Sequence, residues 1–181
     1  KIIENAFKIL SSNINLLVDE NISVLKDTTF NFMHAPAPEI RRMALEMLLE
    51  LYKADKINEQ DFRNQLIKRL RDETDVVKYS AIEVVEKITE KDIKSIDFYI
   101  GIMINEILLR TKNRNLKLKI LDFLEKKIEK IPQDIIYKYD IPRVLDIIEK
   151  STVPKNDDYR KIKMLARSIL ESKPVSYTHL T

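Results

Sequence analysis

The chain has 181 residues, and its 32 basic and 29 acidic side chains leave a formal net charge of +3. Apolar residues make up 44% of it, which is enough for one domain with a buried core. It has no Cys and a single Gly, which argues against a disulfide framework, a thiolate metal site and Gly-rich phosphate-binding loops. No apolar run reaches the roughly 18 residues of a membrane span. We therefore expect a cytoplasmic protein that has no cofactor and no membrane partner.

Apolar periodicity predicts helices along the whole chain up to residue 172. The segment 14–33 is irregular, and the prolines within 35–38 end it because proline removes a backbone donor. Short turns join the predicted helices into pairs. In chain order we expect helices at 1–12, 14–33, 38–53, 58–71, 75–89, 96–110, 116–130, 133–150 and 156–172.

Proline and capping residues mark several of the predicted helix boundaries. Pro38 and Pro132 suit first helical turns, where the missing N–H is not needed. Asn58 and Ser95 are the expected N-caps of the helices that follow them. The triplet Asp140-Ile141-Pro142 is expected to break or kink the segment 133–150.

The apolar pattern of residues 74–88 recurs along the chain at intervals of about 37 to 46 residues. Its spacing of i, i+4, i+7, i+8 and i+11 is typical of an amphipathic helix with one buried stripe. The sequence therefore predicts stacked repeats of one supersecondary unit. In the two best-matched copies the stripe is Ile40, Ala44, Met47, Leu48 and Leu51, then Val77, Ala81, Val84, Val85 and Ile88.

Helix pairs on a common repeat frame resemble HEAT repeats, and the resemblance covers residues 1–172. It implies an all-α fold, a right-handed superhelical α-solenoid of antiparallel helix pairs. It also implies a ladder in which an acid in the turn and a base six residues later bond between neighbouring repeats. Asp72 and Lys78 fit this pattern best. Arg41 and Lys117 occupy the other basic positions, whereas Ala35 and Thr111 replace the acids.

Both ends of the chain differ from the repeats. Lys1 lies inside a copy of the repeated helix, so we expect 1–172 to be a fragment of a longer solenoid with the apolar flank of 1–12 exposed. Residues 173–181 abandon the periodicity, and from Val175 they read VSYTHLT. We expect this segment, with His179, to be a non-native tail.

Side chains suited to catalysis are scarce. Outside the tail His34 is the single histidine, so neither a nucleophilic triad nor a histidine metal pair can be assembled. Acidic pairs such as Asp72-Glu73 stand at helix starts, where they complement the helix dipole. We therefore expect no enzyme activity, no metal and no small-molecule substrate. Because some HEAT-like proteins are DNA glycosylases, a HEAT-like enzyme is the second alternative that the resemblance leaves.

The expected partner surface lies opposite the buried stripe on the second helix of each pair, which in HEAT-like proteins usually lines the concave side. Acids dominate this surface, which favours a basic or amphipathic protein or peptide. An ordinary solvated helix surface explains the same acids equally well. The predicted function is a non-catalytic protein–protein interaction scaffold. At about 100° per residue, the surface consists of Arg42, Glu46, Leu49, Tyr79, Glu83, Glu86, Leu118, Asp122 and Glu125.

Basic residues are concentrated between positions 110 and 119, where no acid interrupts them. Such a turn and helix can contact phosphates, so a nucleic-acid-associated solenoid is the first alternative function. An ordinary solvated turn explains the same residues without a ligand. The basic residues are Arg110, Lys112, Arg114, Lys117 and Lys119.

Overall fold

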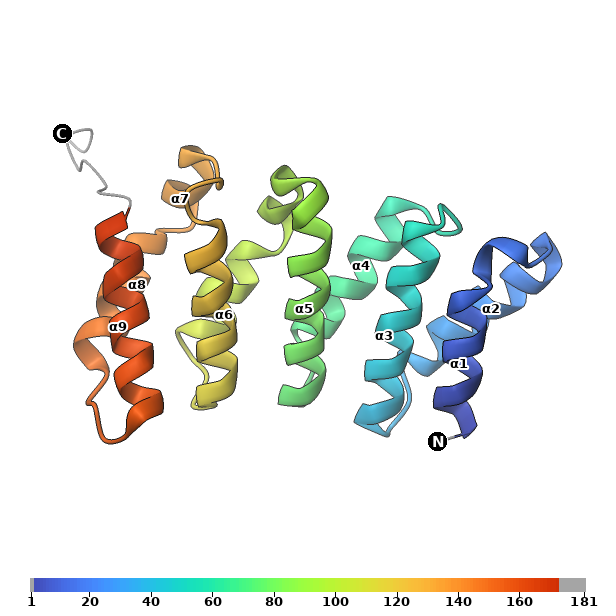
Figure 1. Cartoon of the computed structure of the whole chain (residues 1–181), viewed down its shortest axis with the longest axis horizontal. Helices are drawn as coiled ribbons and strands as arrows, with labels where there is room; N and C mark the ends of the chain where they lie inside the picture. Colours follow the sequence, from blue (N-terminus) through green and yellow to red (C-terminus); the bar gives the residue numbers. More distant parts are fainter. Residues whose placement is uncertain (1, 173–181) are drawn as a thin grey trace. The chain divides into compact units, whose positions relative to one another are not determined.

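The computed structural model describes residues 2–172, except for the side chains of residues 3 and 4 (Figure 1). Within this range every regular element is helical and no strand occurs, which confirms the all-α class. The predicted tail 173–181 lies outside the described residues. By its contacts the chain divides into two compact units, unit 1 (Lys1–Val84) and unit 2 (Val85–Thr181). Among the described helices none has the length and apolar character needed to cross a membrane.

Unit 1 is built around α3, which packs against three other helices of the unit, α1, α2 and α4. Figure 1 shows α1 and α3 side by side, with α2 and α4 in a second layer behind them. Asn58 is the predicted N-cap of α4, and its side chain accepts a hydrogen bond from the Asp61 backbone N–H at 2.8 Å. The elements are α1 (Ile2–Ser12), the 3₁₀-turn η1 (Ile14–Leu16), α2 (Asp19–Phe32), α3 (Pro38–Lys53), α4 (Glu59–Leu70) and the first part of α5 (Asp75–Lys91).

Unit 2 takes the remainder of α5 and is built around α6 and α9. The helix α9 packs against both α8 and α6, and Figure 1 shows α6 and α9 side by side. Asp140 adopts a left-handed conformation (φ 51°) between α7 and α8, so the predicted break before Pro142 is confirmed. The remaining elements are the 3₁₀-helix η2 (Ile93–Phe98), the π-helix η3 (Ile102–Leu108), α6 (Arg114–Lys127), α7 (Gln133–Lys138), α8 (Ile141–Ser151) and α9 (Asp157–Ser172).

The prediction of one regular helix over 96–110 with Ser95 as its N-cap is wrong. The segment instead forms η2 and then η3, and Asp92 caps η2 by accepting from the Lys94 backbone N–H at 3.0 Å. The Tyr139 hydroxyl donates to the Asp97 carbonyl at 2.9 Å, a carbonyl that an uninterrupted α-helix would pair with residue 101. A Cβ at Gly101 would stand 2.5 Å from Tyr139 Cε1, so only glycine admits the ring at this distance. A tertiary contact from Tyr139, which directly follows α7, therefore accompanies the irregular backbone.

Most of the repeated apolar stripe is buried in the core of α3, α5, α6 and α9, as predicted, whereas Ile40 and Ile88 are only half-buried. The copy of the stripe on α1 includes Ile2 and Ile9, and both side chains are exposed. The predicted exposure of the apolar flank of 1–12 is thus confirmed. The buried stripe residues are Ala44, Met47, Leu48, Leu51, Val77, Ala81, Val84, Val85, Leu116, Ile120, Phe123, Leu124, Ile162, Ala166 and Ile169.

We expect Ala81→Leu to lower the free energy of unfolding by about 1–3 kcal/mol, because a packed core accommodates added carbons only by strain. Ala81 is fully buried in α5. Val76→Leu, at an exposed position of the same helix, is the matched control and should leave stability within about 0.5 kcal/mol. Urea unfolding monitored by circular dichroism measures both variants. An Ala81→Leu protein as stable as the parent would contradict close packing at this position.

Candidate binding surfaces

One buried ion pair joins α3 to the turn before α5. Arg41 Nε donates to Asp72 Oδ2 at 2.9 Å and Arg41 Nη2 donates to Oδ1 at 2.8 Å, with both side chains buried. Arg69 Nη1 donates to the same carboxylate at 3.0 Å. The predicted ladder requires an ion pair of this kind, between a base on one repeat and an acid in the turn of the next. The other basic positions do not repeat it, since Lys78 pairs with Asp75 of its own helix at 3.5 Å and Lys117 has no acidic partner among the described residues.

Neighbouring groups stabilise the ionised forms of both Arg41 and Asp72. Burial raises the pKa of the Asp72 carboxyl, but hydrogen bonds from Arg41 and Thr74 and the charge of Arg41 outweigh it and leave that pKa below its ordinary value. The hydrogen bond to Asp72 raises the pKa of Arg41. Arg41 also donates to the carbonyls of Ala35 and Pro36 at 2.8 and 2.9 Å. All three guanidinium nitrogens of Arg41 and both carboxylate oxygens of Asp72 have hydrogen-bond partners within the chain, so the pair has a structural role.

In unit 1 the predicted partner surface is only partly available. Leu49 is 2% exposed, so the expectation that it faces away from the core is wrong. The reason is that α3 is contacted by three helices, which cover more of its circumference than one stripe. Glu46 is exposed but pairs with Arg42 at 2.5 Å. Tyr79 and Glu83 are half-buried.

In unit 2 the predicted surface contains an acid that binds two lysines. Glu86 accepts from Lys119 Nζ at 2.8 Å and from Lys126 Nζ at 2.9 Å, and its side chain is only 16% exposed. Burial raises the pKa of Glu86, but the hydrogen bonds and charges of the two lysines lower it by more. The pKa of Glu86 is therefore below its ordinary value. The expectation that Glu86 is open to a partner is therefore wrong.

The other predicted residues of unit 2 are more accessible. Asp122 pairs with Lys161 at 3.5 Å, Leu118 is half-buried and Glu125 is exposed. Because Asp122 and Glu86 already pair with lysines that are not part of the predicted surface, the net negative charge there is smaller than the nine predicted residues indicate.

The predicted phosphate-binding residues are also partly engaged. Arg114 pairs with Asp158 at 3.0 Å and lies over the Tyr159 ring, 5.6 Å from its centroid. Lys119 is bound to Glu86, and burial lowers the pKa of Lys117. Arg110 and Lys112 are exposed. Two of the five bases are thus committed to ion pairs within unit 2.

His34 lies in the turn after α2, where its Nδ1 is 2.9 Å from the Phe30 carbonyl oxygen. Its ring is exposed. In the part of the chain that the structure describes, no group of three or more His, Asp or Glu side chains comes together in a way that could hold a metal ion.

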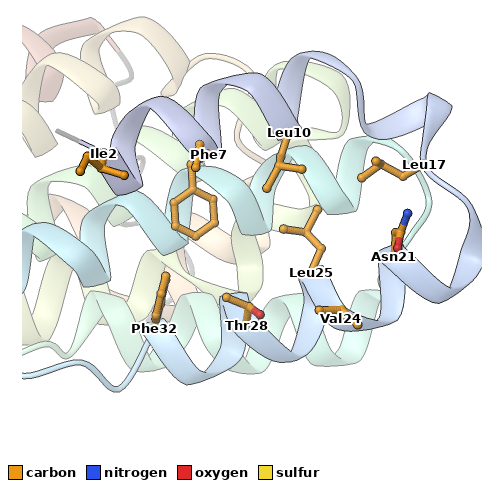
Figure 2. A pocket seen from close by; sticks show the side chains of 10 residues that line it. Ile2, Phe7, Leu10, Leu17, Asn21, Val24, Leu25, Thr28 and Phe32 are labelled. Carbon is orange, nitrogen blue, oxygen red and sulfur yellow. The ribbon is translucent and has the colours of Figure 1, made fainter.

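An apolar groove opens between α1 and α2, with a volume of about 460 Å³ (Figure 2). Phe7 and Leu25 are buried at its base, and the Phe7 ring meets the Phe32 ring edge-on with centroids 5.7 Å apart. Val24 and Ile2 also line the groove, although they are 61% and 88% exposed. Figure 2 shows the labelled side chains of both helices lining one hollow.

Sequence reasoning missed this groove. It anticipated an exposed flank on 1–12, but it predicted 14–33 only as one irregular helix and assigned it no exposed apolar face. The available signal was the spacing of Asn21, Val24 and Thr28, which share a face of α2. No sequence pattern indicates that this face lies opposite the stripe of α1.

No family model, curated protein or solved structure matches this chain. The resemblance to HEAT repeats therefore stays a prediction from the repeat pattern and the helix pairs.

Proposed function

We propose that the chain is a non-catalytic protein-binding module, a HEAT-like array of helix pairs that binds a helix of a partner protein in the groove between α1 and α2. The observation that carries this proposal is the open apolar groove itself. Val24 and Ile2 face solvent there beside buried Phe7 and Leu25. Exposed apolar surface of this kind is typical of interaction sites, and an amphipathic helix fills such a groove with its apolar face. The solenoid stacking and the cytoplasmic location are part of the same proposal.

The groove has better support than the acidic surface predicted from the sequence. On that surface Leu49 is buried and Glu86 is held by two lysines. A nucleic-acid partner has less support, because the committed ion pairs of Arg114 and Lys119 reduce the number of available phosphate contacts.

A panel of amphipathic helical peptides tests the proposal by fluorescence anisotropy with the full chain. We expect at least one peptide to bind, and Val24→Asn to weaken its affinity about tenfold because a buried amide without a partner costs on the order of 1–3 kcal/mol. Val24 is exposed, so the fold should survive. Ser23→Asn is the matched control, since it places the same amide at an exposed position of α2 that does not line the groove. Peptides that bind the Val24→Asn chain as tightly as the parent would contradict the proposal.

A further inference from the structure

The edge of the groove formed by α2 carries two acids. Glu20 stands four residues before Val24 and Asp27 stands three residues after it, so both share the side of α2 that Val24 presents. Both acids are exposed, and among the described residues neither has an ion-pair partner. Their seven-residue spacing places the two charges about 10 Å apart along the helix.

Among the described side chains, the lining of the groove and its other edge carry no charge. The lining side chains are apolar except for Asn21 and Thr28. On α1 the exposed neighbour is Ile9, three residues after Ala6 of the lining. Within the described part of the chain, a ligand in this groove therefore meets apolar groups on the base and on the α1 edge, and negative charge on the α2 edge.

We infer that the partner is an amphipathic helix with Lys or Arg about seven residues apart along one edge of its apolar face. This inference rests on the proposed function and names the chemistry of the partner. The basic edge lies against Glu20 and Asp27, while the apolar face covers Phe7, Val24 and Leu25. A helix of about four turns matches the length of α2. Complementary charge fixes which way the helix faces and rejects acidic helices.

The same charges disfavour a second copy of this chain as the occupant. In a two-fold pairing through the groove, Glu20 and Asp27 of both copies lie in one interface, because an isologous contact uses the same patch twice. Like charges at one interface oppose association.

Two peptides of identical apolar sequence, one with Lys and one with Glu at the edge positions, test the inference against the full chain. At low salt we expect the Lys peptide to bind about tenfold more tightly, and the preference to shrink as salt screens exposed charges. The double variant Glu20→Lys/Asp27→Lys should reverse the preference. Glu90→Lys/Glu129→Lys changes the net charge equally at exposed acids of unit 2 and should not reverse it.

The outcomes separate this inference from the proposed function. Equal binding of both peptides, or a preference for the Glu peptide, overturns the charge inference and leaves helix binding intact. Binding of neither peptide overturns both. A dimer in sedimentation equilibrium that Val24→Asn dissociates places a second copy in the groove and also overturns the inference. The inference is also overturned if a longer form of the chain, with residues before Lys1, does not bind the Lys peptide. In that case the added residues of the same chain fill the groove.

Discussion

Asp72→Ala is expected to lower the free energy of unfolding by about 3–5 kcal/mol, because it leaves the buried Arg41 guanidinium without its buried counter-charge and with only the exposed Glu73 carboxylate beside it. Asp72 also accepts from the Thr74 backbone N–H at 3.0 Å, so the variant loses a cap of the turn as well. Asp75→Ala is the matched control. Its carboxylate is partly exposed and pairs with Lys78 at 3.5 Å, so a loss of at most about 1 kcal/mol is expected. Guanidinium unfolding, with hydrogen exchange to assign the loss to unit 1, measures both.

Two further measurements decide whether the charge pair itself is responsible. Arg41→Met/Asp72→Leu should lose less stability than Asp72→Ala alone, since no buried charge is then left unpaired. The folded pKa of Asp72 is below its unfolded value, so its contribution is present above about pH 4 and is lost as pH falls through the folded pKa. Asp72→Asn should therefore flatten part of the acid-induced loss of stability. Two results together would contradict this account: a stability loss in the double variant equal to the sum of the losses in Arg41→Met and Asp72→Leu, and a pH dependence of stability in Asp72→Asn equal to that of the parent.

Phe123→Ala is expected to lower the free energy of unfolding by about 3–5 kcal/mol through loss of buried area and the cavity it leaves. Phe123 is 1% exposed on α6, which packs against both α9 and η3. The control Phe98→Ala removes the same atoms at a side chain that is 42% exposed, so about 1 kcal/mol or less is expected. The same unfolding assay applies, with hydrogen exchange assigning the loss to unit 2. Equal losses for the two variants would mean that Phe123 is not a core residue.

Sequence alone determined the features that depend on neighbours a few residues away. The bounds of α3 match the predicted 38–53, Asn58 caps α4, and the chain breaks at Asp140 before Pro142. Apolar spacing of 3–4 residues, cap chemistry and proline act within one or two turns, so they can be read from a short window. The buried stripe of α3, α5, α6 and α9 follows from the same periodicity.

Only the tertiary structure decided which faces remain open and which charges are already paired. Leu49 is buried because three helices surround α3, and Glu86 is bound by lysines more than 30 residues away in the sequence. Tyr139 reaches back to Asp97 beside the irregular η2 and η3. The groove exists because α1 and α2 present apolar faces to one hollow. Each of these depends on contacts between distant segments, and a local pattern gives the face of a helix but not what packs against it.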